Sequence, residues 1–209
     1  MLPPHTKRYD IINQFIRNRN YRTFLEIGTD TGENYKRIIA PVRISVDPSP
    51  SSSATYRMTS DEFFDLTSYT GTPENLFSFD VIFIDGLHTC QQAYSDIFNS
   101  LSVLSPNGVI ILHDCLPTSE IMQRHDDSYP GGEWTGDVWK AFVKYRSESM
   151  LLTYTIDRDY GCGIIDESVH IKKPALSLPS GTTMESLTYE DFSSNRDKWL
   201  NVKDVILDE

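Results

Sequence analysis

Short apolar runs of strand length, separated by segments with helical spacing, are the feature that most constrains the fold of this chain. The clearest run, DVIFI at residues 80–84, is apolar almost throughout. Such a run is expected of a strand in a parallel sheet whose two faces are both covered by helices. Similar runs lie at residues 23–27, 42–47 and 109–112. Because helical patterns separate them, the sequence predicts an α/β fold with a doubly wound, mostly parallel sheet.

Seven strands are expected in this sheet. Besides the four runs above, we predict a brief strand near residues 56–58 and two late strands at residues 151–156 and 161–165. The late pair is joined by residues 157–160, a connection too short for a parallel crossover, so the last strand is predicted to run antiparallel. Apolar residues at helical spacing predict the helices. These are expected at residues 5–20, 34–40, 60–66, 89–105, 137–145 and, in the tail, 189–199.

Length and composition indicate a single domain with an appendage. A chain of 209 residues, 39% of them hydrophobic, can bury a core that needs no metal or disulfide to hold it. We place this domain at residues 1–169 and treat residues 170–209 as a polar extension with one helix. No apolar stretch reaches the length of a signal peptide or a membrane span. The odd number of cysteines, without CxxC spacing, favours a reducing compartment.

The net charge of the chain indicates which classes of binding partner to expect. The formal net charge is −11, and no cluster of lysine and arginine is longer than a pair. Nucleic acid and anionic membranes are therefore not expected as partners, since both need a focused basic patch. We expect a cytoplasmic protein that acts on a small molecule, and a homodimer is left open.

The first strand ends in a turn with an unusual charge, FLEIGTDTG at residues 24–32. A dinucleotide-binding turn would read G-x-G-x-x-G, but this one has Asp30 and Glu33 at the second and third glycine positions. Two carboxylates beside a pyrophosphate would repel it. S-adenosylmethionine has no phosphate and carries a sulfonium and an ammonium, which carboxylates attract. The turn therefore favours S-adenosylmethionine over a nicotinamide dinucleotide. Asp47, which ends the second strand, is placed to accept hydrogen bonds from ribose hydroxyls, a role that either cofactor needs.

Five segments together resemble a known family: FLEIGTDTG, ISVDPS, TSDEFF, FDVIFIDGLHTCQQAYSDI and GVIILHDC. Over residues 20–166 the chain resembles the class I S-adenosylmethionine-dependent methyltransferases. It is similar to the branch with macrocin-type sugar O-methyltransferases, in which a D-G-x-H turn follows the fourth strand and an H-D pair ends the fifth. The resemblance implies a cofactor site in which the first turn holds the methionine part, the second strand's acid the ribose and a following turn the adenine. These cofactor-binding residues would be Glu26, Gly28, Thr29, Gly32, Asp47, Ser60, Asp61 and Asp85.

The two motif turns bring together side chains that suit methyl transfer to a hydroxyl. Asp85 and His88 stand three residues apart after one strand, and Asp114 ends a strand that we expect beside it. Adjacent strands lie about 4.8 Å apart, so Asp85 and Asp114 can share a hard divalent cation such as Mg²⁺. His88 can accept the proton of the attacking hydroxyl, a contribution of about 10²- to 10⁴-fold in rate. Asp85 and His88 are thus the predicted catalytic residues.

The metal assignment has an alternative. In the similar metal-dependent catechol methyltransferases an acid–amide pair follows the fifth strand, whereas here the amide position is Cys115, a poor ligand for a hard cation. Asp85 can instead position the cofactor or cap the next helix. His88 can simply precede that helix, and His113 can orient the structure or the substrate.

Residues 115–136 form a long, weakly patterned connection that is either a lid over the site or a surface insertion. At its end and just after it, Trp134, Trp139 and Lys140 offer either an aromatic wall for a sugar or part of a helix core. The function that the sequence favours is transfer of a methyl group to a hydroxyl of a sugar or a glycosylated natural product. The two rivals are a nicotinamide-dependent oxidoreductase and a non-catalytic scaffold that keeps the fold.

Overall fold

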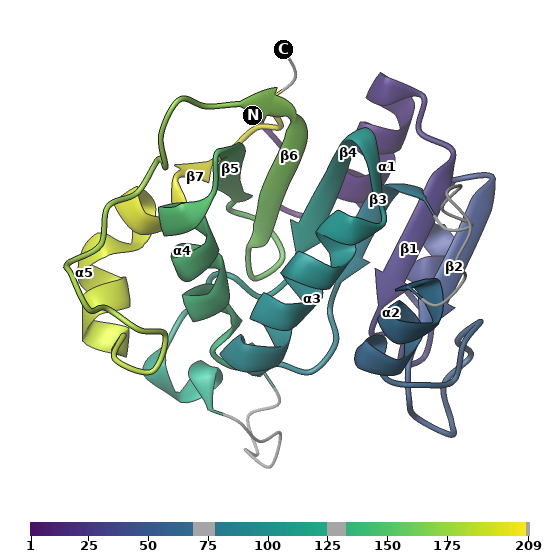
Figure 1. Cartoon of the computed structure of the whole chain (residues 1–209), viewed down its shortest axis with the longest axis horizontal. Helices are drawn as coiled ribbons and strands as arrows, with labels where there is room; N and C mark the ends of the chain where they lie inside the picture. The colour runs from purple at the N-terminus through teal and green to yellow at the C-terminus, as the bar shows by residue number, and fades with distance from the viewer. Residues whose placement is uncertain (69–77, 125–132, 208–209) are drawn as a thin grey trace.

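The computed structural model, which describes residues 1–68, 78–124 and 133–207, has one mixed sheet with helices on both faces (Figure 1). The strands are β1 (Thr23–Ile27), β2 (Val42–Val46), β3 (Phe79–Ile84), β4 (Leu104–Leu112), β5 (Leu151–Ile156), β6 (Cys162–His170) and β7 (Val202–Lys203). The helices are α1 (Arg8–Arg19), α2 (Ser60–Ser68), α3 (Cys90–Ser102), α4 (Val138–Glu148) and α5 (Tyr189–Leu200), with 3₁₀ turns η1 (Tyr35–Arg37) and η2 (Glu120–Gln123).

The strand order β2-β1-β3-β4-β6-β5-β7 places the strands that end in polar turns next to one another. The pairs β2–β1, β1–β3 and β3–β4 are parallel, and Ile27, Ile84 and Leu112 lie at the same level in the sheet. The residues that follow them therefore emerge side by side at the carboxyl edge. β6 runs antiparallel between β4 and β5, which confirms the antiparallel strand predicted from the short connection before it.

Two expected elements differ from the sequence prediction. Residues 56–58 form no strand, because after a single bridge between Val46 and Tyr56 the chain turns into α2. The seventh strand is instead β7, which pairs with β5.

The helix expected at residues 34–40 is only the short turn η1. The next two residues have side-chain partners for their backbone groups, since Arg43 Nη1 donates to the carbonyl of Ile38 and Asn13 Oδ1 accepts from the N–H of Ile39. These contacts hold the backbone extended, as Pro41 also requires of the residue before it.

Each central strand contributes to two separate cores. On β3, Ile82 and Ile84 pack with α3 and α4, whereas Val81 and Phe83 pack with α1 on the opposite face, and all four are at most 2% exposed. Because both faces are covered, the strand is apolar throughout rather than alternating. The carboxyl edge of the sheet is thereby held on a rigid support.

The tail packs against the domain. α5 lies on α4 (Figure 1), with the ring centroids of Trp139 and Phe192 4.9 Å apart, and Leu200 is fully buried in the same core. The helix expected at residues 189–199 is confirmed by α5. In the described ranges, no helix combines the length and the apolar character needed to cross a membrane.

Candidate functional site

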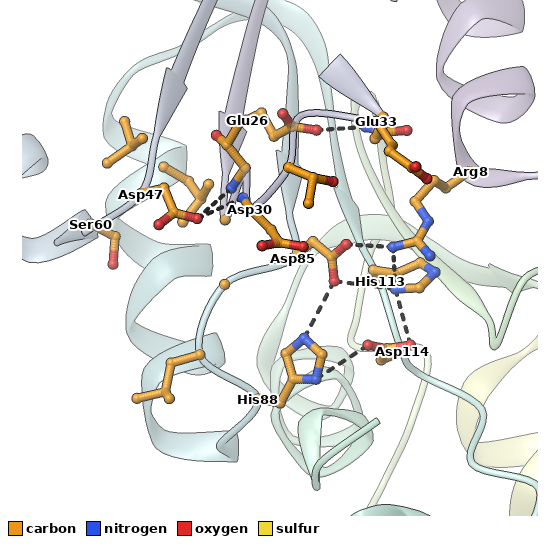
Figure 2. A pocket seen from close by; sticks show the side chains of 18 of the residues that line it. Arg8, Glu26, Asp30, Glu33, Asp47, Ser60, Asp85, His88, His113 and Asp114 are labelled. Atoms are coloured by element: carbon orange, nitrogen blue, oxygen red, sulfur yellow. Dashed lines mark hydrogen bonds and ion pairs between the residues drawn. The ribbon is translucent and has the colours of Figure 1, made fainter. Parts of the chain in front are cut away.

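A cavity of about 1060 Å³ opens at the carboxyl edge of the sheet, where the turns after β1, β2, β3 and β4 meet (Figure 2). Its volume suits a nucleoside cofactor together with part of a second ligand. The residues predicted to bind cofactor, to catalyse or to hold a metal line this cavity, with one exception, Gly32. The lining residues among them are Glu26, Gly28, Thr29, Asp47, Ser60, Asp61, Asp85, His88 and Asp114.

The two glycines of the first turn have structural reasons to be glycine. Gly28 has φ +85°, and a Cβ there would lie 2.0 Å from the carbonyl oxygen of Asp85. Only glycine therefore allows the β1 turn to lie directly against the β3 turn. Gly32 has φ +74°, and a Cβ there would lie 2.7 Å from Ser53 Oγ. It therefore allows the backbone of the turn but does not line the cavity.

The first turn contains three buried polar atoms without partners among the described residues. Glu26 is 1% exposed; its Oε1 accepts from Asn34 Nδ2 at 2.6 Å, but its Oε2 has no partner. Thr29 Oγ1 and Asn34 Oδ1 lack partners as well. A buried polar atom without a hydrogen bond costs about 1–3 kcal/mol, so this group indicates a ligand that brings N–H donors. All three atoms are oxygens that can accept a hydrogen bond, as an ammonium group requires.

Burial also changes the ionisation of Glu26, raising its pKa to about 8. The folded, ligand-free protein thus holds a proton that the unfolded chain releases above its ordinary pKa of about 4.5. Stability should therefore fall as the pH rises from 4.5 to about 8, and Glu26→Gln should remove this loss. We expect the Tm advantage of Glu26→Gln over the unmodified protein to grow across that range, by about 2–4 °C for each kcal/mol. Thermal melts at several pH values test this, and an advantage that does not change with pH would refute it.

Asp47 closes the first turn. Its Oδ2 accepts from the backbone N–H groups of Thr29 and Asp30, at 2.9 and 2.7 Å, and its Oδ1 accepts from the N–H of Ser49 at 2.8 Å. The carboxylate therefore fixes the turn while also lining the cavity. Asp30 and Glu33 line it too, so the surroundings of Gly28 are acidic, as the sequence predicted.

Another part of the cavity wall is formed by the start of α2 and by α3. Gln92 Nε2 donates to Ser60 Oγ at 3.3 Å and to Asp61 Oδ1 at 3.1 Å. It also donates to Asp96 Oδ1 at 3.1 Å, and burial raises the pKa of Asp96 to about 6. This network holds the Ser60–Asp61 turn against the cavity wall.

A cluster of charged side chains occupies the other side of the cavity, around Asp85 (Figure 2). Asp85 Oδ1 lies 3.4 Å from His88 Nε2 and 3.2 Å from His113 Nδ1. Asp85 Oδ2 lies 2.5 Å from Nη1 of Arg8, the first residue of α1. Burial opposes ionisation, but His113, His88 and Arg8 together hold the pKa of Asp85 well below its ordinary value. Asp85 is therefore a carboxylate.

His88 lies between two carboxylates and under an indole ring. Its Nδ1 is 3.4 Å from Asp114 Oδ2, opposite the contact of Nε2 with Asp85. The ring of Trp134 stacks on it with centroids 4.4 Å apart. Burial lowers the pKa of His88, but Asp85 and Asp114 raise it by more, so the net pKa lies above the ordinary value. His88 is thus a strengthened base with a fixed ring orientation.

His113 is almost fully buried behind this cluster. Its Nδ1 lies 3.0 Å from Asp114 Oδ1, and its Nε2 lies 3.7 Å from Asp159 Oδ2. Burial is again outweighed by the nearby carboxylates, which raise the pKa of His113 well above its ordinary value. A carboxylate oxygen lies near each ring nitrogen, so His113 is held in place behind the cluster.

The predicted metal residues come together, but their surroundings do not suit magnesium. Asp85, His113 and Asp114 each offer one ligand atom, all within 4.8 Å of one another. One of these atoms is an imidazole nitrogen, whereas Mg²⁺ prefers oxygen. Nη1 of Arg8 lies 2.5 Å from Asp85 Oδ2 and 3.3 Å from His113 Nδ1, so a guanidinium already occupies this corner. Cys115 offers sulfur rather than oxygen, and burial raises the pKa of its thiol. Both properties make it a poor ligand for a hard cation.

Trp134 and Trp139, which the sequence offered as an aromatic wall or as helix core, lie in different surroundings. Trp134 lines the cavity, whereas Trp139 belongs to α4 and is fully buried in the core. Gly136 has φ +61°, and a Cβ there would lie 1.8 Å from the carbonyl oxygen of His88, so the end of the long connection packs tightly on the β3 turn. Residues 125–132 of that connection lie outside the described residues, and its role as lid or insertion stays a prediction.

Among the lining residues that sequence reasoning missed are Arg8, Asp159 and Glu133. Tyr160 Oη donates to Glu133 Oε1 at 2.5 Å, which ties the β5–β6 turn to the end of the long connection. No local pattern marks these residues, because they reach the site only through the packing of α1 and of that turn.

Comparison with known proteins finds one matching family and several solved structures of the same fold. Residues 14–115 match a family described as a methyltransferase domain. An O-methyltransferase from Bacillus cereus, solved in complex with SAH, is 17% identical with a TM-score of 0.52, and the likeness covers 79% of this chain and 83% of that one. A putative caffeoyl-CoA O-methyltransferase from Staphylococcus aureus is 18% identical, with a TM-score of 0.53 and coverage of 78% and 85%.

A third solved structure is the O-methyltransferase of tomaymycin synthesis from Streptomyces achromogenes, in complex with SAM. It is 14% identical, with a TM-score of 0.52 and coverage of 75% of this chain and 78% of that one. Among curated proteins the sequence finds no match. The chain therefore has the fold of these O-methyltransferases, and residues 14–115 match a methyltransferase domain, which confirms the fold class expected from the sequence.

Proposed function

We propose that the protein is an S-adenosylmethionine-dependent O-methyltransferase that acts on a hydroxyl of a small molecule. The matched domain supports this, as do neighbours of the same fold that carry SAM or SAH. The observation that carries the proposal is the group of unpartnered buried atoms on Glu26, Thr29 and Asn34, which fits the cofactor's ammonium. Asp47 would hold the ribose hydroxyls, and the Ser60–Asp61 turn would hold the adenine.

The proposed reaction is an in-line displacement. Bound S-adenosylmethionine supplies a methyl group that an oxygen can take, leaving S-adenosylhomocysteine as the electron pair of the broken S–CH₃ bond stays on sulfur. His88 takes the proton of the attacking hydroxyl as the new C–O bond forms, so the products are a methyl ether and an imidazolium. Asp85 and Asp114 stabilise that imidazolium from both sides. Trp134 keeps the ring in place and water away from it.

We propose a sugar or a glycosylated compound as the acceptor. Trp134 and Tyr160 line the cavity next to Asp85 and Asp114, so aromatic faces and hydrogen-bonding groups lie together. This combination suits a ring with several hydroxyls. A second cavity of about 600 Å³ shares Lys7, Asp159 and Tyr160 with the first, and it offers space for the rest of a larger acceptor.

Magnesium assistance is not part of the proposed reaction, because the corner that would hold the ion is occupied by Arg8. The acidic surroundings of Gly28 also disfavour the nicotinamide-dependent alternative, since Asp30 and Glu33 both line the cavity. A scaffold would have no use for a histidine held between two carboxylates beside an open cavity.

Transfer of a labelled methyl group tests the proposal. The protein is incubated with S-adenosylmethionine carrying a ¹³C-methyl group and with a panel of sugars and glycosides, and the products are analysed by NMR. We expect label in a new methyl ether and an equal amount of S-adenosylhomocysteine. Label on nitrogen or carbon would contradict O-methylation. If S-adenosylmethionine binds but is never consumed with any hydroxylated acceptor, the scaffold alternative is favoured.

A further inference from the structure

The guanidinium of Arg8 is fixed from behind by the turn between β5 and β6. Asp159 Oδ2 accepts from Arg8 Nε at 2.9 Å and from the Arg8 backbone N–H at 3.1 Å. Asp159 Oδ1 accepts from Lys7 Nζ at 2.9 Å. The side chain of Asp159 is only 2% exposed, so this anchor is shielded from water. The start of α1 is thereby tied to the active-site edge by three contacts with one carboxylate.

The front of the guanidinium faces the acids of the cavity. Nη1 lies 2.5 Å from Asp85 Oδ2 and 3.3 Å from His113 Nδ1, and these two residues belong to the group that could hold a metal ion. Arg8 therefore places a permanent positive charge at the edge of that group. Figure 2 shows the guanidinium pointing at Asp85 and His113 from the α1 side.

Charge at this corner is already balanced by the protein itself. The carboxylates of Asp85 and Asp159 face the cations of Arg8 and Lys7. A divalent cation would bring two further positive charges next to a guanidinium that is held in place by Asp159. At separations of a few ångströms in a partly buried site, like charges repel one another strongly. The ion could enter only if Arg8 moved away.

One part of the guanidinium remains free for a ligand. Arg8 lines the cavity, and its Nη2 has no hydrogen-bond partner among the described residues. Arginine presents its donors in a rigid, planar fork, so anchoring Nε and Nη1 also fixes the direction of Nη2. The Nη2 N–H groups can therefore donate a hydrogen bond to an acceptor oxygen placed near Asp85 and His88.

We propose that Arg8 takes the place of a divalent cation in this site, neutralising Asp85 and donating to the acceptor oxygen. The first part of this inference stands on the geometry of the ligand-free cluster, and only the second rests on the proposed function. Methyl transfer would then need no metal, because a guanidinium fixed by Asp159 supplies the positive charge.

Binding of Mn²⁺, measured by the loss of the free-ion EPR signal, tests the first part without any substrate. The unmodified protein should bind no Mn²⁺ at this cluster. Arg8→Ala leaves Asp85, His113 and Asp114 without the competing cation and should gain one Mn²⁺ site per chain. The double variant Arg8→Ala/Asp85→Asn should lose that site again. Arg17→Ala is the matched control, because Arg17 is an exposed arginine on the same helix, and it should behave like the unmodified protein.

Several results would overturn the inference. Mn²⁺ binding by the unmodified protein that Asp85→Asn abolishes would show that the cluster is a metal site despite Arg8. Failure of Arg8→Ala to gain a site, with circular dichroism unchanged, would show that Arg8 is not what excludes the ion. Turnover that EDTA abolishes and Mg²⁺ restores would contradict metal-independent transfer. If no methyl transfer is found at all, the EPR result still decides the first part, so failure of the proposed function is distinguishable.

Discussion

Replacing His88 with glutamine should lower kcat by about 10²- to 10⁴-fold, the contribution typical of a general base. Glutamine is close to histidine in size and keeps hydrogen-bonding groups between Asp85 and Asp114, but it cannot accept the hydroxyl proton. Affinity for S-adenosylhomocysteine should stay within a factor of about two, because the His88 ring contacts Asp85 and Asp114, whereas Glu26 and Asp47 are proposed to bind the cofactor. The measurement is steady-state methyl transfer together with calorimetric titration of the cofactor product.

His170→Gln is the matched control for this prediction. His170 ends β6, is exposed and lies away from the cavity, so the same chemical change there should leave kcat unaffected. Equal activity of His88→Gln and the unmodified protein would show that the proton goes elsewhere. A parallel loss of cofactor affinity would show that His88 supports the pocket rather than the proton transfer.

Replacing Asp47 with alanine should weaken binding of S-adenosylmethionine by more than tenfold. Two effects combine in this loss. The ribose hydroxyls lose a charged acceptor, and hydrogen bonds to charged groups are worth about 1.5–3 kcal/mol each. The backbone N–H groups of Thr29, Asp30 and Ser49 lose their partner as well, so the turn that frames Gly28 loosens. Calorimetric titration of the ligand measures the total.

Asp65→Ala controls for the removal of an acidic charge near the site, because Asp65 is exposed on α2 and does not line the cavity. Its affinity should match that of the unmodified protein. Thermal melts separate the two effects at Asp47, since a loosened turn lowers the Tm without ligand. Unchanged affinity in Asp47→Ala would remove the ribose assignment.

Most of the cofactor site could be predicted from the sequence because its residues follow directly after buried strands. Glu26, Asp47, Asp85 and Asp114 all stand at or just beyond the carboxyl ends of strands that were identified from short apolar runs. In a parallel sheet those ends share one edge, so strand identification alone brings the acids together. The chemistry of each turn is likewise local, as with the acidic residues beside Gly28.

The rest of the site depends on contacts between distant parts of the chain. Arg8 is 77 residues from Asp85 and 151 from Asp159, and its place is set by how α1 packs on the sheet, which periodicity does not specify. Trp134 and Trp139 look alike in the sequence, yet one faces His88 and the other the core, because the direction of the chain before α4 decides between them. The family resemblance implied that Gly32 contacts the cofactor, whereas a Cβ on Gly32 would meet Ser53 Oγ rather than the cavity.

The central claim, that the acidic cavity beside Gly28 takes a sulfonium nucleoside, is tested most directly by calorimetric titration of the unmodified protein. We expect S-adenosylmethionine and S-adenosylhomocysteine to bind at one site per chain and NAD to produce no binding heat. Tight binding of NAD, with S-adenosylhomocysteine unable to displace it, would contradict the account.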